Sequence, residues 1–273
     1  MSYATLMVYV ESDRMPVERV RLAAHLANKF NDALIGLSAL PIGGPVVAGG
    51  VLVADTSPTD LKEVRAKLAD KGNWFRNIAG AVHRNVEWRP MLDVPIVALA
   101  REARVADLVV VGQHAASGDV YSALDPGRVV LWTGRPTLVV PEGVTVLRAD
   151  HIVIGWKDTR EARRVVRDSL PFLQEATRVT IVETCASGEE SAARERVDDV
   201  ARYLNRHHIT GGPRVILHRD GSPAALLIRL AQDEGADLLV TGAYGHSRLG
   251  EWIFGGVTHE LLATSPICCL MSH

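Results

Sequence analysis

The sequence predicts an α/β protein built from two copies of one fold, each a five-stranded, parallel, doubly wound sheet. Three observations support this: the length of 273 residues, an internal repeat, and the alternation of strand and helix patterns within each copy. A chain of this length has room for about two domains of typical size. Strands that alternate with helices favour a parallel sheet with right-handed crossovers.

The repeat is clearest at two apolar segments whose residue numbers differ by 130. Residues 106–112 have the sequence Ala-Asp-Leu-Val-Val-Val-Gly, and residues 236–242 have the sequence Ala-Asp-Leu-Leu-Val-Thr-Gly. In both copies a proline, Pro136 or Pro266, follows the glycine after the same interval and precedes a short apolar run. Because spacing and residue types are both kept, two copies of one module explain the pattern better than one large domain.

In the second copy, periodicity predicts helices over residues 159–173, 189–208 and 256–263. The stripe of Val197, Val200, Ala201 and Leu204 is typical of an amphipathic helix. A further helix is expected to begin at Ser222-Pro223, where a capping residue precedes a proline. Apolar, β-branched segments predict strands over residues 151–156, 178–184, 214–218, 237–241 and 267–271.

The first copy is expected to repeat this order. Its strands are predicted over residues 5–10, 33–40, 86–91, 107–111 and 137–140, and a Gly- and Pro-rich insertion over residues 41–58 is interpreted as a long surface loop. The predicted domains are residues 1–141 and residues 149–273, joined by a linker over residues 141–150.

Composition excludes several classes of function. Lys and Arg together number 30, and Asp and Glu together number 32, with no basic block, so sequence-independent binding of nucleic acid is not expected. No apolar stretch reaches the length of a membrane span, and the N-terminus does not resemble a signal peptide. Three cysteines are too few for a disulfide framework. We expect a soluble, cytoplasmic protein.

The loop after the fourth strand of the second copy carries the clearest functional pattern. In doubly wound sheets, ligands bind beyond the carboxyl ends of the strands. Glycines there allow a ligand to approach the backbone, and free N–H groups at a helix start attract anions. We therefore expect a phosphate cradle in this segment, although the glycines would also suit an ordinary turn. Its candidate residues are Thr241, Gly242, Gly245, Gly255, Gly256, Val257 and Thr258.

The spacing of Gly242, Gly245 and Gly255, with a small residue following, resembles the Gly-x2-Gly-x9-Gly motif of the universal stress proteins. The stretch Asp220-Gly221-Ser222-Pro223 and the Ser265-Pro266 pair also resemble that family. The chain thus looks like a tandem universal stress protein. The resemblance implies Rossmann-like domains of the adenine nucleotide α-hydrolase type that bind ATP, possibly with magnesium, or another adenine nucleotide.

The resemblance also assigns binding roles outside the glycine loop. Gly155 ends the first strand of the second copy, and the family's backbone contact to adenine corresponds to Val182. Family members usually carry an aspartate where this chain has Lys157, so Asp158 takes over that role or Lys157 faces a phosphate. Arg248, within the loop, is expected to neutralise phosphate charge or to lie in solvent.

The first copy departs from the motif. On the offset of 130, Gly245 corresponds to Ala115, Gly255 to Asp125 and Gly256 to Pro126. A proline has no N–H group to donate, and an aspartate repels phosphate. We expect at most one ATP per chain, bound in the second domain, and a structural or regulatory role for the first domain.

The sequence favours a stress-response sensor or binding module over an efficient enzyme. We identify no catalytic residue and no metal site, because no P-loop, dinucleotide fingerprint or zinc spacing is present. Two alternatives remain: a scaffold of the same fold that binds no nucleotide, and a slow ATP hydrolase. The family resemblance implies subunit pairing through last strands, so residues 137–140 are expected to pair with residues 267–271 in an internal pseudo-dimer. A homodimer of chains is also possible.

Overall fold

The computed structural model describes residues 2–41, 45–48, 51–54, 58–113, 123–217, 222–245 and 256–273. The chain folds into two compact units, residues 3–133 and residues 134–273. Ser2, at the N-terminal end, belongs to the second of these units. Both units are α/β with parallel strands and covering helices, which confirms the predicted α/β class. The strand of residues 137–140, predicted as the fifth strand of the first copy, belongs to the second compact unit. No helix within the described ranges is long and apolar enough to cross a membrane.

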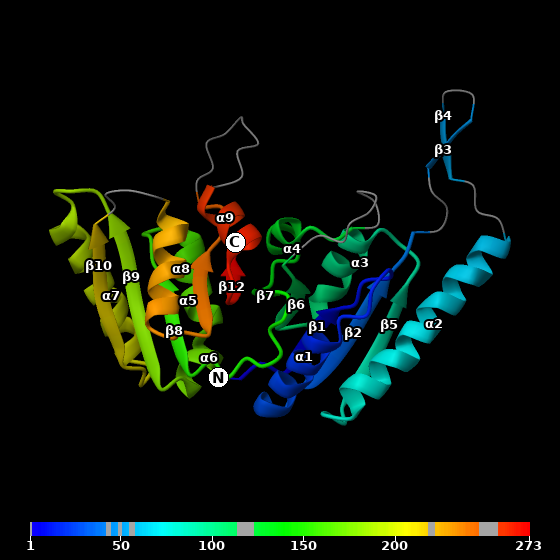
Figure 1. The fold of residues 1–273 in the computed structure, drawn as a ribbon, viewed down its shortest axis with the longest axis horizontal. Helices are drawn as coiled ribbons and strands as arrows, with labels where there is room; N and C mark the ends of the chain where they lie inside the picture. Colours follow the sequence, from blue (N-terminus) through cyan, green and yellow to red (C-terminus); the bar gives the residue numbers. More distant parts are fainter. Residues whose placement is uncertain are drawn as a thin grey trace. The chain divides into compact units, whose positions relative to one another are not determined.

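The sheet of residues 3–133 contains four parallel strands in the order β6-β1-β2-β5. The long helix α2 lies beside β5 at one edge of this sheet (Figure 1). The elements of this unit are β1 (Thr5–Tyr9), α1 (Val17–Phe30), β2 (Ala33–Ala39), β3 (Pro45–Ala48), β4 (Val51–Ala54), α2 (Pro58–Gly80), β5 (Val86–Met91), α3 (Pro95–Glu102), a 3-10 turn η1 (Ala103–Val105), β6 (Leu108–Gly112) and α4 (Pro126–Trp132).

The sheet of residues 134–273 contains the five predicted parallel strands in the order β10-β9-β8-β11-β12. Helix α7 covers β9 and β10 (Figure 1). The elements of this unit are β7 (Thr137–Val140), β8 (His151–Gly155), α5 (Arg160–Asp168), α6 (Leu170–Glu175), β9 (Arg178–Cys185), α7 (Glu190–Asn205), β10 (Gly211–Leu217), α8 (Pro223–Asp233), β11 (Leu238–Gly242), α9 (Gly256–Thr264) and β12 (Cys268–Ser272).

Strand β7 pairs with β12 in antiparallel register, Leu138 opposite Leu270. This is the pairing predicted between residues 137–140 and 267–271. The compact unit that contains both strands begins at Gly134. The physical reason is that β7 covers the backbone edge of β12, which would otherwise present unpaired N–H and C=O groups.

Two local predictions were wrong. The insertion over residues 41–58 was interpreted as a loop, but β3 and β4 within it form an antiparallel pair, Val46 opposite Val53. The single helix expected over residues 159–173 is divided into α5 and α6 at Ser169. Pro171 has no N–H group to continue the hydrogen-bond ladder of α5, so α5 ends before it and Pro171 lies in the first turn of α6, which begins at Leu170.

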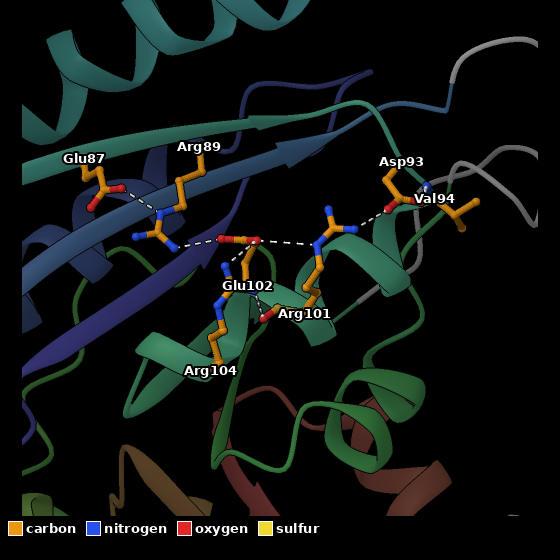
Figure 2. A network of polar contacts seen from close by, with 7 residues as sticks. All are labelled: Glu87, Arg89, Asp93, Val94, Arg101, Glu102 and Arg104. Carbon is orange, nitrogen blue, oxygen red and sulfur yellow. Dashed lines mark hydrogen bonds and ion pairs between the residues drawn. The ribbon is translucent and has the colours of Figure 1, made fainter.

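A network of ion pairs joins β5 to α3. The buried carboxylate of Glu102 accepts a hydrogen bond of 2.8 Å from Arg89 on β5 and lies 3.4 and 3.5 Å from nitrogens of Arg104 and Arg101 (Figure 2). Arg101 also donates a hydrogen bond to one carboxylate oxygen of Asp93. The other oxygen of Asp93 accepts a hydrogen bond from the Val94 N–H at the start of α3 (Figure 2). Such charges suppress pairing of an edge strand with another chain.

Asp32, at the start of β2, is a buried carboxyl whose Oδ2 has no hydrogen-bond partner among the described residues. Burial, together with the charge of Asp107, raises its pKa to about 6. Folding therefore favours the protonated form, and stability falls as the pH rises from about 4 to about 6.

We expect Asp32→Asn to raise the free energy of unfolding by about 1–2 kcal/mol at pH 8, because the amide removes a buried charge. The gain should vanish at pH 4, where the carboxyl is protonated in both states. Urea unfolding at the two pH values measures this. The exposed Asp70→Asn on α2 is the control, and an equal gain at both pH values would contradict the interpretation.

Candidate nucleotide site

The carboxyl ends of β8, β9 and β11 surround a cavity of about 540 Å³ in the unit of residues 134–273. Pockets for drug-sized ligands and cofactors commonly measure about 300–1,000 Å³. The loops after these strands and the start of α9 form its walls. The lining residues are Gly155, Trp156, Lys157, Asp158, Thr159, Ala162, Glu183, Thr184, Cys185, Ala186, Glu189, Arg196, Pro223, Leu227, Thr241, Gly242, Tyr244, Gly245, Gly256, Val257 and Thr258.

Most of the predicted binding residues meet in this cavity, although they are spread over more than a hundred positions of sequence. Arg248 and Gly255 lie outside the described residues, and Val182 does not line the cavity. The predicted residues that line it are Gly155, Thr241, Gly242, Gly245, Gly256, Val257 and Thr258.

Val182 is fully buried in β9, opposite Gly155 of β8. Its carbonyl accepts a hydrogen bond of 2.7 Å from the Trp156 N–H, so this carbonyl serves the sheet. The cavity wall begins one residue later, at Glu183, and continues to Ala186. Sequence reasoning missed these residues because only the three-dimensional register shows where β9 passes the end of β8.

Gly242 and Gly155 are required by packing. A Cβ on Gly242 would lie 2.5 Å from the backbone nitrogen of Ala162, so the first turn of α5 rests directly on this glycine. A Cβ on Gly155 would lie 2.9 Å from side-chain carbons of Leu227 and Thr241. The absence of a side chain at Gly242 brings the start of α5 against the end of β11, and at Gly155 it leaves room for Leu227 and Thr241.

The start of α5 carries a buried acid beside the glycine loop. Thr159 caps the helix by accepting a hydrogen bond from the Ala162 N–H, and a Cβ on Gly245 would lie 3.1 Å from the Glu161 Oε2. Burial opposes ionisation of Glu161, but hydrogen bonds from Arg160, its own N–H and Thr159, with the Arg160 charge, lower its pKa. Glu161 is therefore ionised, and any side chain at Gly245 would crowd it.

The start of α9 forms the opposite wall. The first N–H groups of a helix have no partner within the helix, and its dipole attracts negative charge. A Cβ on Gly256, the first residue of α9, would meet no atom of the described residues within 4 Å. The Thr258 hydroxyl oxygen accepts a hydrogen bond of 3.1 Å from the Tyr244 N–H, which ties α9 to the end of β11.

Tyr244 has a left-handed backbone with φ of 57°. Such a conformation costs a non-glycine residue on the order of 1–3 kcal/mol and is concentrated at functional sites. Here it turns the chain between β11 and the Gly245 end of the loop. The neighbouring Thr241 hydroxyl is buried without a hydrogen-bond partner among the described residues. The loop thus holds a strained turn at the cavity wall.

The charged groups on the cavity wall are mixed in sign. Glu183 is buried and held by Arg196 through hydrogen bonds of 2.5, 2.9 and 3.1 Å. Asp158 is paired with Arg163 at 2.5 Å, and the exposed Lys157 also lines the wall. Since no single sign dominates, attraction for an anion rests on local backbone N–H groups.

Cys185 is the one thiol on the cavity wall within the described part of the chain. Its pKa is raised by burial and then by the charges of Glu190, Glu183 and Glu189. The protonated thiol is a weak nucleophile. This wall therefore offers no activated cysteine for covalent chemistry.

The corresponding position in residues 3–133 is filled by a side chain. Gly112 ends β6 as Gly242 ends β11, but a Cβ on Gly112 would overlap the guanidinium of Arg19 from α1. Arg19 and Glu11 form a hydrogen-bonded ion pair, and both are buried. Burial lowers the pKa of Arg19, while the Glu11 charge and hydrogen bond oppose the shift.

The anion-attracting helix start is also altered in that unit. Helix α4 begins with Pro126, which has no N–H group, and the Asp125 carboxylate accepts a hydrogen bond of 3.0 Å from the Gly127 N–H. The chain thus supplies its own anion to this helix start. The missing N–H group of Pro126 and the carboxylate of Asp125 both make the start of α4 less suited to a phosphate than the start of α9.

Comparison with known proteins gives one match to a family. Residues 173–273 match the sequence model described as the Universal stress protein family. No curated protein matches the sequence. A universal stress protein from Archaeoglobus fulgidus has a similar structure, with a TM-score of 0.76 and 10% identity over 98% of this chain and 95% of that chain.

A Pseudomonas aeruginosa protein of unknown function is also similar, with a TM-score of 0.59 and 13% identity over 99% of this chain and 92% of that chain. At these identities, the structural matches establish the fold. The sequence match establishes a universal stress protein region over residues 173–273, which includes the whole glycine loop, residues 241–258, and α9.

Proposed function

We propose that the chain is a tandem universal stress protein whose second domain binds ATP, or another adenine nucleotide, in the 540 Å³ cavity. The observation that carries the proposal is the convergence of Gly245 and the start of α9 on one cavity at the carboxyl ends of the strands. This is where doubly wound sheets bind nucleotides. The family match over residues 173–273 supports the same assignment.

The residues present fit a phosphate chain. The N–H groups of Gly256 and Val257 begin α9, and a Cβ on Gly256 would meet no atom of the described residues within 4 Å. The Thr258 oxygen accepts from Tyr244, which leaves its own hydroxyl hydrogen to donate. Magnesium, if bound with ATP, would be held largely by phosphate oxygens and water. The activity we propose is binding, as a sensor or switch.

We also propose a cytoplasmic location and an internal pseudo-dimer. Three buried free cysteines suit the reducing cytoplasm. The antiparallel pairing of β7 with β12 supports an internal pseudo-dimer in place of pairing between two subunits.

We expect titration calorimetry with ATP to give one nucleotide per chain, because Arg19 and Asp125 fill the corresponding positions of residues 3–133. A stoichiometry near two would contradict the assignment to one domain.

The same protein, denatured and analysed by mass spectrometry for released small molecules, tests the class of function. Release of ATP or ADP supports a nucleotide-binding module. If no nucleotide is released and none binds on titration, the chain is a scaffold of the same fold, and rapid turnover of added ATP would make it an enzyme.

A further inference from the structure

A second cavity, of about 480 Å³, lies between α5 and α7 in the unit of residues 134–273. Trp156, Asp158 and Arg196 line both this cavity and the nucleotide cavity, so the two share a wall. The remaining residues lining the second cavity are Arg163, Val166, Arg167, Asp199, Val200 and Tyr203.

The spacing of the lining residues shows how the cavity arises. Arg163, Val166 and Arg167 lie on one face of α5, and Arg196, Asp199, Val200 and Tyr203 lie on one face of α7. In residues 3–133, α1 and α2 pack against one another. Between α5 and α7 an open space separates the facing rows instead, with Trp156 at the shared wall.

The walls combine aromatic and aliphatic surface with positive charge. The rings of Trp156 and Tyr203 and the side chains of Val166 and Val200 provide apolar surface. Two lining arginines are neutralised, since Arg163 pairs with Asp158 and Arg196 with Glu183.

Arg167 is different from the other two arginines. It is exposed and forms no ion pair within the part of the chain that the structure describes. Arginine can bind a carboxylate through two parallel hydrogen bonds. The cavity therefore has a cation available for an anionic ligand.

Trp156 gives the cavity an aromatic wall at its boundary with the nucleotide cavity. Its indole Nε1 is buried and has no hydrogen-bond partner among the described residues. Because this atom is buried, the residue offers the cavity its aromatic ring for stacking and apolar contact, not a hydrogen bond.

We propose that this cavity binds a planar aromatic acid, with its ring between the two helices and its carboxylate at Arg167. Flat rings pack well against Trp and Tyr in offset or edge-to-face arrangements. The proposal does not depend on nucleotide binding. The shared Trp156 wall gives such a ligand a direct route to influence the neighbouring nucleotide cavity.

Calorimetric titration of the full chain with 2-naphthoate, as a probe of the ligand class, tests this proposal. We expect saturable binding at one site per chain. The neutral analogue 2-naphthamide should bind at least about tenfold more weakly, because a charge-assisted hydrogen bond is lost. Absence of saturable naphthoate binding at low millimolar concentrations would overturn the proposal.

Two variants locate the site. Arg167→Met should weaken naphthoate binding about tenfold or more, and Val200→Phe should weaken it by narrowing the space between α5 and α7. Arg194→Met on α7 is the matched control, because Arg194 is exposed and does not line the cavity. Thermal unfolding of each variant establishes that it is folded. Unchanged binding by folded Val200→Phe would show that the probe lies elsewhere.

The nucleotide proposal is tested separately in the same experiment. Gly256→Asp, at the nucleotide cavity only, should leave naphthoate binding unchanged. Failure of the wild-type chain to bind ATP, with naphthoate still bound, contradicts the proposed function alone. Binding of ATP without naphthoate contradicts only the second site.

Discussion

Gly256→Asp is expected to lower the affinity for ATP by about 100-fold or more without unfolding the second domain. Among the described residues, a Cβ at this position meets nothing within 4 Å, so we expect the side chain to fit. An aspartate in the first turn of a helix is favourable by itself, by about 0.3–1 kcal/mol. The same carboxylate would repel a phosphate close to the start of α9 by about 4 kcal/mol at 4 Å with an effective dielectric constant of about 20.

Two matched controls separate charge from shape. Gly256→Ala keeps the N–H group and adds only a methyl group, and Gly256→Asn has the shape of aspartate without its charge. Calorimetry with ATP should give near wild-type affinity for Gly256→Ala and a smaller loss for Gly256→Asn. Equal affinities for Gly256→Asp and Gly256→Ala would refute the role of α9 in phosphate binding.

The sequence alone suggests Gly245→Asp as the variant that abolishes nucleotide binding without unfolding. The structure makes it a poorer test, since its Cβ would lie 3.1 Å from both Glu161 Oε2 and Thr159 Oγ1. A second carboxylate beside the ionised Glu161 adds like-charge repulsion. We therefore expect this variant to lose stability as well as affinity, and Gly256 to be the cleaner position.

Arg19→Met is expected to lower the free energy of unfolding of residues 3–133 by about 3–5 kcal/mol. The substitution removes the buried arginine that pairs with the buried Glu11 carboxylate and leaves it only Arg14, at 3.4 Å, and breaking a buried pair on one side is strongly destabilising. Urea unfolding, followed by circular dichroism, measures the loss in the transition of this unit.

The double variant Glu11→Leu with Arg19→Met should recover most of that stability, because it removes both buried charges together. The control is Arg194→Met in the exposed pair with Asp198, where we expect a change below about 0.5 kcal/mol. If Arg19→Met costs no more than this surface control, the Glu11–Arg19 pair does not hold the first unit together.

Much of the fold was predictable because local chemistry and tertiary structure agree. Ser222 caps α8 through the Ala225 N–H and precedes Pro223, as the sequence indicates. The buried face of α7 is the predicted stripe of Val197, Val200, Ala201 and Leu204. The β3–β4 pair was not predictable from the Gly- and Pro-rich composition of its segment, and the break at Ser169 requires the specific effect of Pro171 within a continuous helical pattern.

The site was predictable only in part, because tertiary packing brings some of its residues together. The glycine spacing indicates where backbone approaches closely, but Glu161 comes to Gly245 only through the packing of α5 on Gly242. Glu183 and Arg196 come from a strand and a helix, and nothing in their sequence spacing indicates that they share a cavity wall.

By itself, the sequence showed an internal repeat, predicted the α/β class, and placed the glycine pattern in one copy of that repeat. Periodicity, capping residues and the repeat are local patterns, so they can be recognised from the sequence alone. Only the tertiary structure decided that Arg19 fills the space beside Gly112 and that α5 and α7 leave an aromatic cavity. Which side chains fill or leave space depends on how helices pack on the sheet, and packing brings together residues that no spacing relates.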